Sequence, residues 1–113
     1  MSRRNKYGAK PVVVDGVRFA SKAEAKRDAE LVLLERAGKI ADLRRQPKFD
    51  LVVNGKKVCR YVGDWQYYEI CEDHDAPVSV PVVEDRKGVL TPAFKIKWAL
   101  AKALYPDIEW RLS

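Results

Sequence analysis

A short charged segment follows two apolar residues in Val82–Gly88, which has the sequence Val-Val-Glu-Asp-Arg-Lys-Gly. Side chains alternate faces along a strand, so Asp85 and Lys87 are expected on one side. Glu84 and Arg86 then lie on the other side. A carboxylate here can hold a divalent cation, and a lysine beside it can orient or activate a water molecule. The same residues also fit a solvated strand end with an ion pair, so other parts of the chain must decide between the two interpretations.

A second carboxylate is expected opposite the first. The two apolar strands on either side of the acidic turn 71–77 should pair as an antiparallel hairpin that is symmetric about the middle of that turn. In this register Asp64 faces Asp85 directly, with both side chains on one face of the sheet. Like charges opposed across strands destabilise a sheet, and a bound Mg²⁺ would offset their repulsion. A bulge at Pro81 would shift the register by one residue, and Gly63 is expected to leave space for a closely approaching ligand.

A helix that carries a third acid is predicted to begin at Ser21, which forms a capping box with Glu24 three residues later. Gly38 is a natural stop, so the helix is expected to end near Ala37. Glu24 has two interpretations that can coexist, as the capping partner of Ser21 and as an acid on the edge of the buried face. The apolar stripe of the helix is predicted at Ala25, Ala29, Val32 and Leu33.

The other elements are separated by turn signals. Asp15-Gly16 and Asn54-Gly55 are two-residue turns of the kind that favours hairpins, and Thr91 can cap a second helix. Three strands between two helices, with a further strand at the end, predict an α/β (α+β) fold in which helices flank a mixed central sheet. The predicted elements are a hairpin over 12–19, a helix to 37, a connector over 40–46, strands over 48–53, 57–70 and 78–87, a helix over 92–105 with a core stripe of Phe94, Trp98, Ala101 and Tyr105, and a strand over 107–112.

The composition favours one small globular domain with a basic balance. The 113 residues carry a formal net charge of +6, which suits a polyanion such as nucleic acid. No apolar run approaches the roughly 20 residues of a membrane span, and Cys59 and Cys71 are expected to be reduced, packed thiols of a cytoplasmic protein. Residues 1–10 are predicted to be a flexible basic arm before a single domain over 11–113. Candidate nucleic-acid contacts are Arg3, Arg4, Lys6, Lys95 and Lys102. The first three fit a disordered tail equally well, and the last two fit a solvated helix face equally well.

Glu24 on the first helix, Asp64 in one strand and Asp85-Arg86-Lys87 in the next resemble the pattern of the PD-(D/E)XK nuclease superfamily. The resemblance implies the restriction-endonuclease-like fold, with its αβββαβ core, preceded here by an N-terminal β-hairpin. More narrowly, the chain is similar to a family of small phage and prophage endonucleases. Two departures are Gly63, where the superfamily has proline, and Asp85, where glutamate is commoner. The stretches that carry the resemblance are Lys6-Tyr7, Val14–Gly16, Phe19–Ala25, Gly38–Ile40, Gln46–Phe49, Tyr61–Trp65, Val83–Gly88 and Thr91-Pro92.

The resemblance implies that Asp64 and Asp85 bind a metal ion together with the backbone carbonyl of Arg86. Lys87 would be the catalytic lysine, which orients the attacking water or stabilises the charge that develops on the phosphate. Glu84 adjoins Asp85, so the choice of ligand between these two acids stays open. The resemblance also implies that Glu24 binds the metal ion or its water molecules and that Gln46 supports the site.

The implied activity is Mg²⁺-dependent hydrolysis of DNA phosphodiester bonds by a phage-type endonuclease, with Mn²⁺ as a substitute for Mg²⁺. Related enzymes act on Holliday junctions and flaps in recombination and repair, and a homodimer would suit paired nicks on branched DNA. Two other interpretations stay open. One is a non-catalytic DNA-binding or host-interaction protein on a nuclease fold, and the other is a metal site at Asp73-His74-Asp75. The number of metal ions, and DNA as opposed to RNA, also stay open.

Overall fold

The computed structural model describes residues 10–72 and 76–113. The basic residues Arg3, Arg4 and Lys6 and the alternative metal site at Asp73-His74-Asp75 lie outside the described residues. Along the chain, the elements are β1 (Val12–Val14), β2 (Val17–Phe19), α1 (Lys22–Arg36), β3 (Ile40–Arg45), β4 (Lys48–Val53), β5 (Lys56–Val62), β6 (Trp65–Glu72), β7 (Pro77–Asp85), α2 (Pro92–Leu104) and β8 (Glu109–Leu112).

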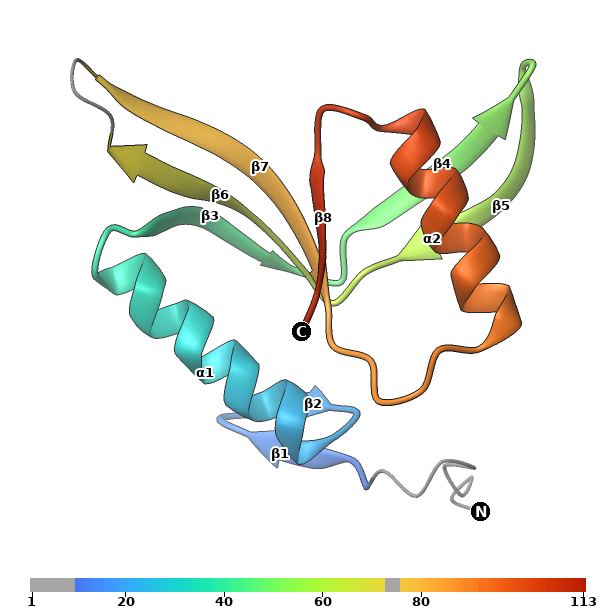
Figure 1. Cartoon of the computed structure of the whole chain (residues 1–113). Helices are drawn as coiled ribbons and strands as arrows, with labels where there is room; N and C mark the ends of the chain where they lie inside the picture. Colours follow the sequence, from blue (N-terminus) through green and yellow to red (C-terminus); the bar gives the residue numbers. More distant parts are fainter. Residues whose placement is uncertain (1–9, 73–75) are drawn as a thin grey trace.

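The central sheet is mixed and has the strand order β3-β6-β7-β8. Strand β6 is antiparallel to both of its neighbours, β3 and β7, and β8 runs parallel to β7 after the chain has passed through α2. A parallel pair needs such a long connection, which a helix commonly supplies. The prediction of an α+β fold with a mixed sheet and two helices is therefore confirmed. Figure 1 shows this sheet and a separate β4–β5 ribbon diverging from one point near the centre of the molecule.

The prediction of three strands between the helices is wrong in two places. The expected connector 40–46 contains the edge strand β3, in which Asp42 has a φ of 55° and a register shift separates Ala41 from Arg44. This irregularity interrupts the two-residue period by which a strand is identified in a sequence. The expected long strand 57–70 is divided at Gly63 into β5 and β6, which belong to different sheets.

Gly63 is required for close packing inside the protein rather than for the approach of a ligand. A Cβ atom at this position would lie 3.0 Å from Cγ1 of Val83 and 3.4 Å from Cγ of Pro47. The backbone N–H of Gly63 also donates to the carbonyl of Pro47 at 3.0 Å. The expectation that Gly63 leaves free space is thus wrong, because Val83 fills it.

Helix α1 begins and ends where the sequence predicts, but its buried face is different. Ser21 accepts a hydrogen bond from the backbone N–H of Glu24, and Gly38 follows the helix with a φ of 76°. The fully buried positions are Asp28 and Leu31, not the predicted apolar stripe, of which Leu33 is 63% exposed. The carboxylate of Asp28 can be buried because Arg45 and Trp65 donate hydrogen bonds to it.

Two apolar clusters lie on opposite faces of β7, because neighbouring side chains of a strand alternate sides. Val82 belongs to the cluster beneath α1, and Val83 belongs to the cluster beneath α2. The predicted α2 stripe is confirmed, since Ala101 is buried and the aromatic members pack around it. Thr91 caps this helix by accepting from the N–H of Phe94. The clusters comprise Leu31, Ile40, Trp65, Tyr67 and Val82 on one face and Leu51, Tyr61, Val83 and Ala101 on the other.

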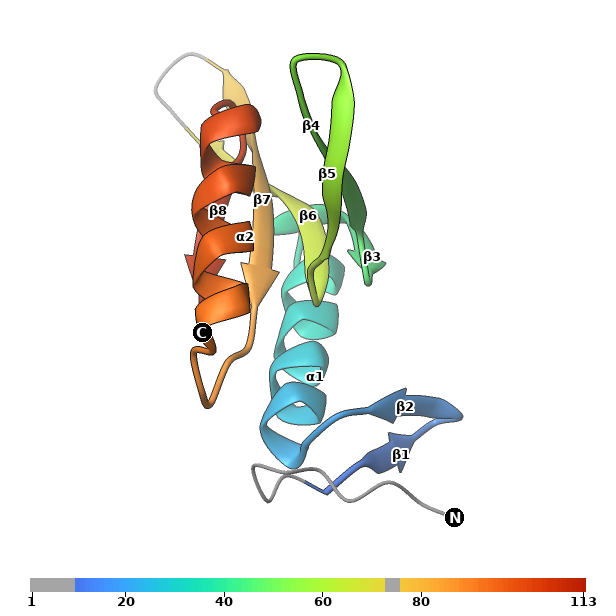
Figure 2. The ribbon, with the colours of Figure 1, turned by 90° about the vertical axis from the view of Figure 1, so that its right-hand side faces the viewer.

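The β1–β2 ribbon turns at Asp15-Gly16 with positive φ at both residues, as predicted. It lies at the N-terminal end of α1 (Figure 2), and Phe19 on β2 lines a cavity together with Arg45 on β3 and Trp65 on β6. Among the described residues, no helix is long and apolar enough to cross a membrane. Both cysteines are free thiols. Cys59 is half-buried, whereas Cys71 is exposed and so is not packed as expected.

Candidate functional site

The β6–β7 hairpin has the predicted register. Trp65 pairs with Glu84 at one end of the hairpin, and Pro81 pairs with Tyr68 without any register shift. Beyond the last pair, the N–H of Asp64 donates to the carbonyl of Glu84 at 3.3 Å. Asp64 is thereby held at the start of β6, next to the end of β7, where the sequence places its partner.

Asp85 lies across from Asp64 and is completely buried. Asp64 Oδ2 accepts from the backbone N–H of Arg86 at 2.8 Å, which fixes the first carboxylate beside the second. Tyr61 donates its hydroxyl proton to Oδ2 of Asp85, whereas Oδ1 of Asp85 has no hydrogen-bond partner among the described residues. Burial and the neighbouring carboxylate of Asp64 raise the pKa of Asp85 to about 8. Oδ1 of Asp85 is therefore buried without a hydrogen bond from the described residues, and the carboxylate beside it adds a like charge.

Glu84 has the opposite environment on the other face of β7. Arg27 donates to both of its carboxylate oxygens at 2.6 and 3.0 Å, and Tyr67 donates its hydroxyl proton at 2.7 Å. Burial alone would raise the pKa of Glu84, but these hydrogen bonds hold it below its usual range. Glu84 is thus satisfied by residues of the protein. Asp85, in contrast, has a buried oxygen without a hydrogen-bond partner among the described residues.

Glu24 projects from the first turn of α1 toward the same pair. Burial and the charge of Asp64 raise the pKa of Glu24, and the charge of Lys87 opposes that shift. A cavity of about 140 Å³ is lined by Glu24, Asp64 and Gln46. Helix α1, the start of β6 and the end of β7 therefore bring three predicted acids together.

Lys87 lies beside Asp85, as the alternation of side chains predicts. Its Nζ atom is 3.6 Å from Oδ1 of Asp85 and 4.9 Å from the ring centroid of Phe94. About a third of the side chain (32%) is exposed. The ammonium group is therefore held at the mouth of the site, where a phosphate can reach it. Arg86 points elsewhere, with its guanidinium donating to the backbone carbonyl of Ser113 at 2.6 Å.

Gln46 is attached to the site through the backbone of Asp64. Its N–H donates to the carbonyl of Asp64 at 2.9 Å, and its φ of 53° lies in the left-handed region. A residue other than glycine adopts this conformation uncommonly. The turn between β3 and β4 thereby presents the Gln46 side chain to the cavity, in agreement with its predicted place near the acids.

The candidate nucleic-acid contacts on α2 are not part of the acid cluster. Lys95 and Lys102 are both exposed, and neither lines the cavity beside Asp64. Three residues that contact the acids or line the cavity were not identified from the sequence. No sequence signal connects Tyr61, on a different sheet, with Asp85, and none connects Arg27 with Glu84, 57 positions away. Arg18, on β2, lines the cavity as well.

The residues present fit a divalent cation that is held only in part by side chains. Within residues 10–72 and 76–113, no group of three or more His, Cys, Asp and Glu side chains is placed to hold a metal ion. Mg²⁺ commonly uses one or two carboxylates and completes its shell with water and substrate phosphate oxygens. Asp64 and Asp85 supply that pair of carboxylates, and a cation would also give Oδ1 of Asp85 a partner.

Comparison with known proteins identifies a family but no activity. A family model described as "Protein of unknown function (DUF1064)" matches residues 4–113. No curated protein and no solved structure matches the chain.

Proposed function

We propose that this chain, which belongs to the DUF1064 family, is a metal-dependent endonuclease of the PD-(D/E)XK type that hydrolyses DNA phosphodiester bonds. The order of Asp64, Asp85 and Lys87 along adjacent strands supports this proposal. The order α1, β3, β6, β7, α2, β8 supports a restriction-endonuclease-like core, in which β4 and β5 would be an insertion.

The observation that carries the proposal is the environment of Asp85. Its Oδ1 atom is buried and has no hydrogen-bond partner in the part of the chain that the structure describes, and its pKa is raised by burial and by Asp64. Two neighbouring carboxylates, one fully buried (Asp85) and one half-buried (Asp64), destabilise a sheet unless a cation or a proton reduces their repulsion. An ion pair at a solvated strand end, the simpler interpretation of the sequence, does not account for a side chain that is fully buried.

Asp64 and Asp85 would hold the cation, with the backbone carbonyl of Arg86 as a further ligand. Bound Mg²⁺, or Mn²⁺ in its place, would polarise the phosphodiester and lower the pKa of a water molecule. Lys87, at the mouth of the site, would stabilise the negative charge that develops on the phosphate. Glu24, whose pKa is raised, is placed to accept a proton or a hydrogen bond from the attacking water.

The proposed substrates are branched or structured DNA, such as Holliday junctions and flaps. One site cuts one strand, so a homodimer would deliver the paired nicks that resolve a junction. The net charge of +6 supports binding to the DNA backbone. The proposed setting is a phage-type enzyme that acts in the cytoplasm of a bacterial host during recombination or repair.

Cleavage of labelled linear duplex, flap, fork, four-way junction and RNA hybrid substrates tests this function. Wild type should cleave at least one DNA substrate with Mg²⁺ or Mn²⁺ and none in EDTA. Asp85→Asn should lose most of this activity, because metal-ion catalysis supplies several kcal/mol and each 1.4 kcal/mol is about tenfold in rate. Asp42→Asn, at an exposed acid on β3, is the matched control.

The alternative of a non-catalytic DNA-binding protein would be supported by a different outcome. Wild type would then bind the DNA panel without cutting any member in the presence of either metal. A trace of contaminating nuclease would be revealed by equal activity in wild type and Asp85→Asn preparations.

A further inference from the structure

We infer that a trough beside Glu24 and Asp64 binds an unpaired nucleotide next to the scissile phosphate, with Arg18 as its phosphate contact. The inference rests on the proposed nuclease function and narrows its substrate class. The proposed enzyme would thus prefer DNA with an unpaired nucleotide at the cut, such as a flap or a fork, to a continuous duplex.

The trough consists of two adjoining cavities under the β1–β2 ribbon. The inner cavity, about 140 Å³, is lined by Glu24 and Asp64, and the outer cavity, about 490 Å³, is lined by Pro11 and Ala20. Three residues line both cavities, namely Arg18, Phe19 and Gln46. A ligand that begins at the acids can therefore continue outward past these three side chains.

The sizes of the two cavities indicate what each can hold. The inner cavity is smaller than the roughly 300–1,000 Å³ of ordinary ligand pockets, so it suits a phosphate group and not a base. The outer cavity falls within that range and suits a sugar with its base. A base that enters a pocket has left its stack and its pairing partner, which costs least where the base is already unpaired. The trough therefore favours a DNA strand that is unpaired at this nucleotide.

Arg18 is the cation that the trough offers to a phosphate. Arg45 also lines the inner cavity, but it donates to both oxygens of Asp28 at 2.7 and 2.9 Å. Arg18 is exposed and makes no ion pair within residues 10–72 and 76–113. A guanidinium group binds a phosphate through two parallel hydrogen bonds, which gives both affinity and orientation.

Gln46 is a polar residue that lines both cavities of the trough together with Arg18. Its φ of 53° lies in the left-handed region, which glycine adopts without strain, and strained residues of this kind cluster at ligand sites. The amide has both donors and acceptors, so it can hydrogen-bond to the sugar or to the edge of an unpaired base. Phe19 provides an apolar wall between the two cavities.

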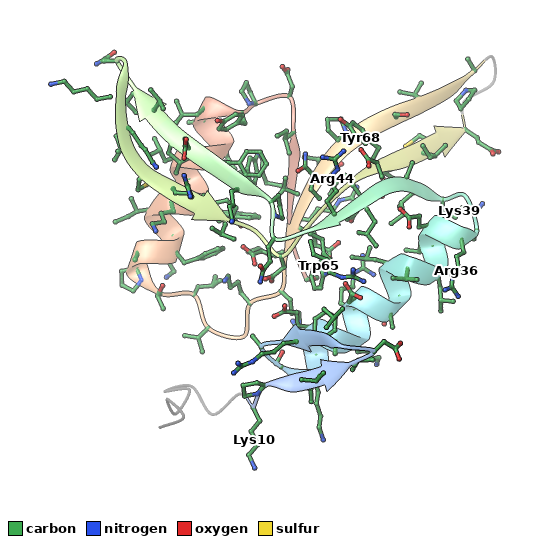
Figure 3. All side chains as sticks on the ribbon, turned by 180° about the vertical axis from the view of Figure 1, so that it is seen from behind. Lys10, Arg36, Lys39, Arg44, Trp65 and Tyr68 are labelled. Atoms are coloured by element: carbon green, nitrogen blue, oxygen red, sulfur yellow. The ribbon has the colours of Figure 1, made fainter. Side chains whose placement is uncertain are left out.

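The test compares two DNA molecules of the same sequence, a nicked duplex and a duplex with a single-stranded flap at the nick. Binding is measured by fluorescence anisotropy with Ca²⁺ at several salt concentrations, and cleavage is measured with Mg²⁺. Arg18→Ala is compared with Lys39→Ala, a change of an exposed cation at the far end of α1 from the β1–β2 ribbon (Figure 3). Gln46→Gly removes the amide while keeping a backbone that glycine tolerates.

Arg18→Ala should weaken flap binding by about tenfold, since a hydrogen-bonded charge contact is lost, and should weaken binding of the nicked duplex much less. The slope of binding against salt should decrease by about 1. Gln46→Gly should lower flap binding several-fold while unfolding at the same or a higher urea concentration, and Lys39→Ala should change neither substrate's affinity.

The outcomes separate this inference from the proposed function. If Arg18→Ala leaves flap binding unchanged, or weakens both substrates equally, the trough does not bind an unpaired nucleotide. If wild type binds the flap through Arg18 but never cuts it, the inference that the trough binds an unpaired nucleotide is supported and the nuclease proposal fails. Absence of binding to any nucleic acid would overturn both.

Discussion

Replacing Asp85 by asparagine is expected to stabilise the metal-free protein near neutral pH, although it removes a proposed ligand. Burial and Asp64 raise the pKa of Asp85 to about 8 in the folded protein, whereas an unfolded chain has an aspartate pKa of about 3.9. Between these two values the folded protein holds a proton that the unfolded chain has released. The free energy of unfolding therefore falls as pH rises and levels off above about pH 8.

The size of this pH dependence follows from the one extra proton that the folded protein binds. The slope is about 1.4 kcal/mol per pH unit, or about 3 kcal/mol between pH 5 and pH 7. Asparagine has no such proton to lose, keeps the shape of Asp85 and can accept the hydrogen bond of Tyr61 through its amide oxygen. The raised pKa of Glu24 also contributes to the dependence of stability on pH. The difference between wild type and variant therefore isolates the contribution of Asp85.

Urea unfolding in EDTA between about pH 5 and pH 8 measures this slope. Asp42→Asn should keep the wild-type slope, because Asp42 is half exposed (52% of its side chain). Adding Mn²⁺ at pH 8 should stabilise wild type and not Asp85→Asn, since a ligand stabilises only the state that binds it. The reasoning is refuted if wild type and Asp85→Asn have the same dependence of stability on pH.

Three further changes test the surroundings of the site. Tyr61→Phe removes the hydroxyl that donates to the buried aspartate, and calorimetry should show Mn²⁺ affinity reduced by about tenfold; an unchanged affinity would remove Tyr61 from the site. Gly63→Ala places a Cβ 3.0 Å from Val83 and should lower the free energy of unfolding by about 1–3 kcal/mol, whereas an unchanged urea midpoint would show that the strand can shift. Arg27→Ala leaves Glu84 buried without its cation and should cost about 3 kcal/mol in urea unfolding. That loss of stability should be larger at high pH, where Glu84 must be charged. A loss independent of pH would contradict the role of Arg27 as the cation that stabilises charged Glu84.

The parts of the fold that depend on neighbouring residues could be predicted from the sequence. The hairpin turns at Asp15 and Asn54, the cap at Ser21 and the α2 stripe all follow from short-range rules of backbone conformation and spacing. The pairing of β6 with β7 could also be predicted, because a symmetric hairpin with no bulge has a single register. That register led from Asp85 to its proposed partner across the sheet.

The parts that depend on distant residues could not be predicted in this way. Strand β3 was missed because Asp42 adopts a left-handed conformation and breaks the alternation. The burial of Asp28 contradicts the expected apolar stripe, since its donors come from β3 and β6. The hydroxyl of Tyr61 reaches Asp85 only because β5 leaves the central sheet for a second one.

The aromatic cluster beside the buried aspartate also gives the proposed site an intrinsic optical signal. The ring of Tyr61, whose hydroxyl contacts that aspartate, lies 6.0 Å from Trp98 and 5.6 Å from Trp110. Phe94, next to the ammonium group of Lys87, stacks on Trp98 at 5.4 Å. A change of charge at the site therefore alters the electric field at two indole rings. Tryptophan emission and near-ultraviolet circular dichroism can consequently follow cation binding in the natural chain, without a label.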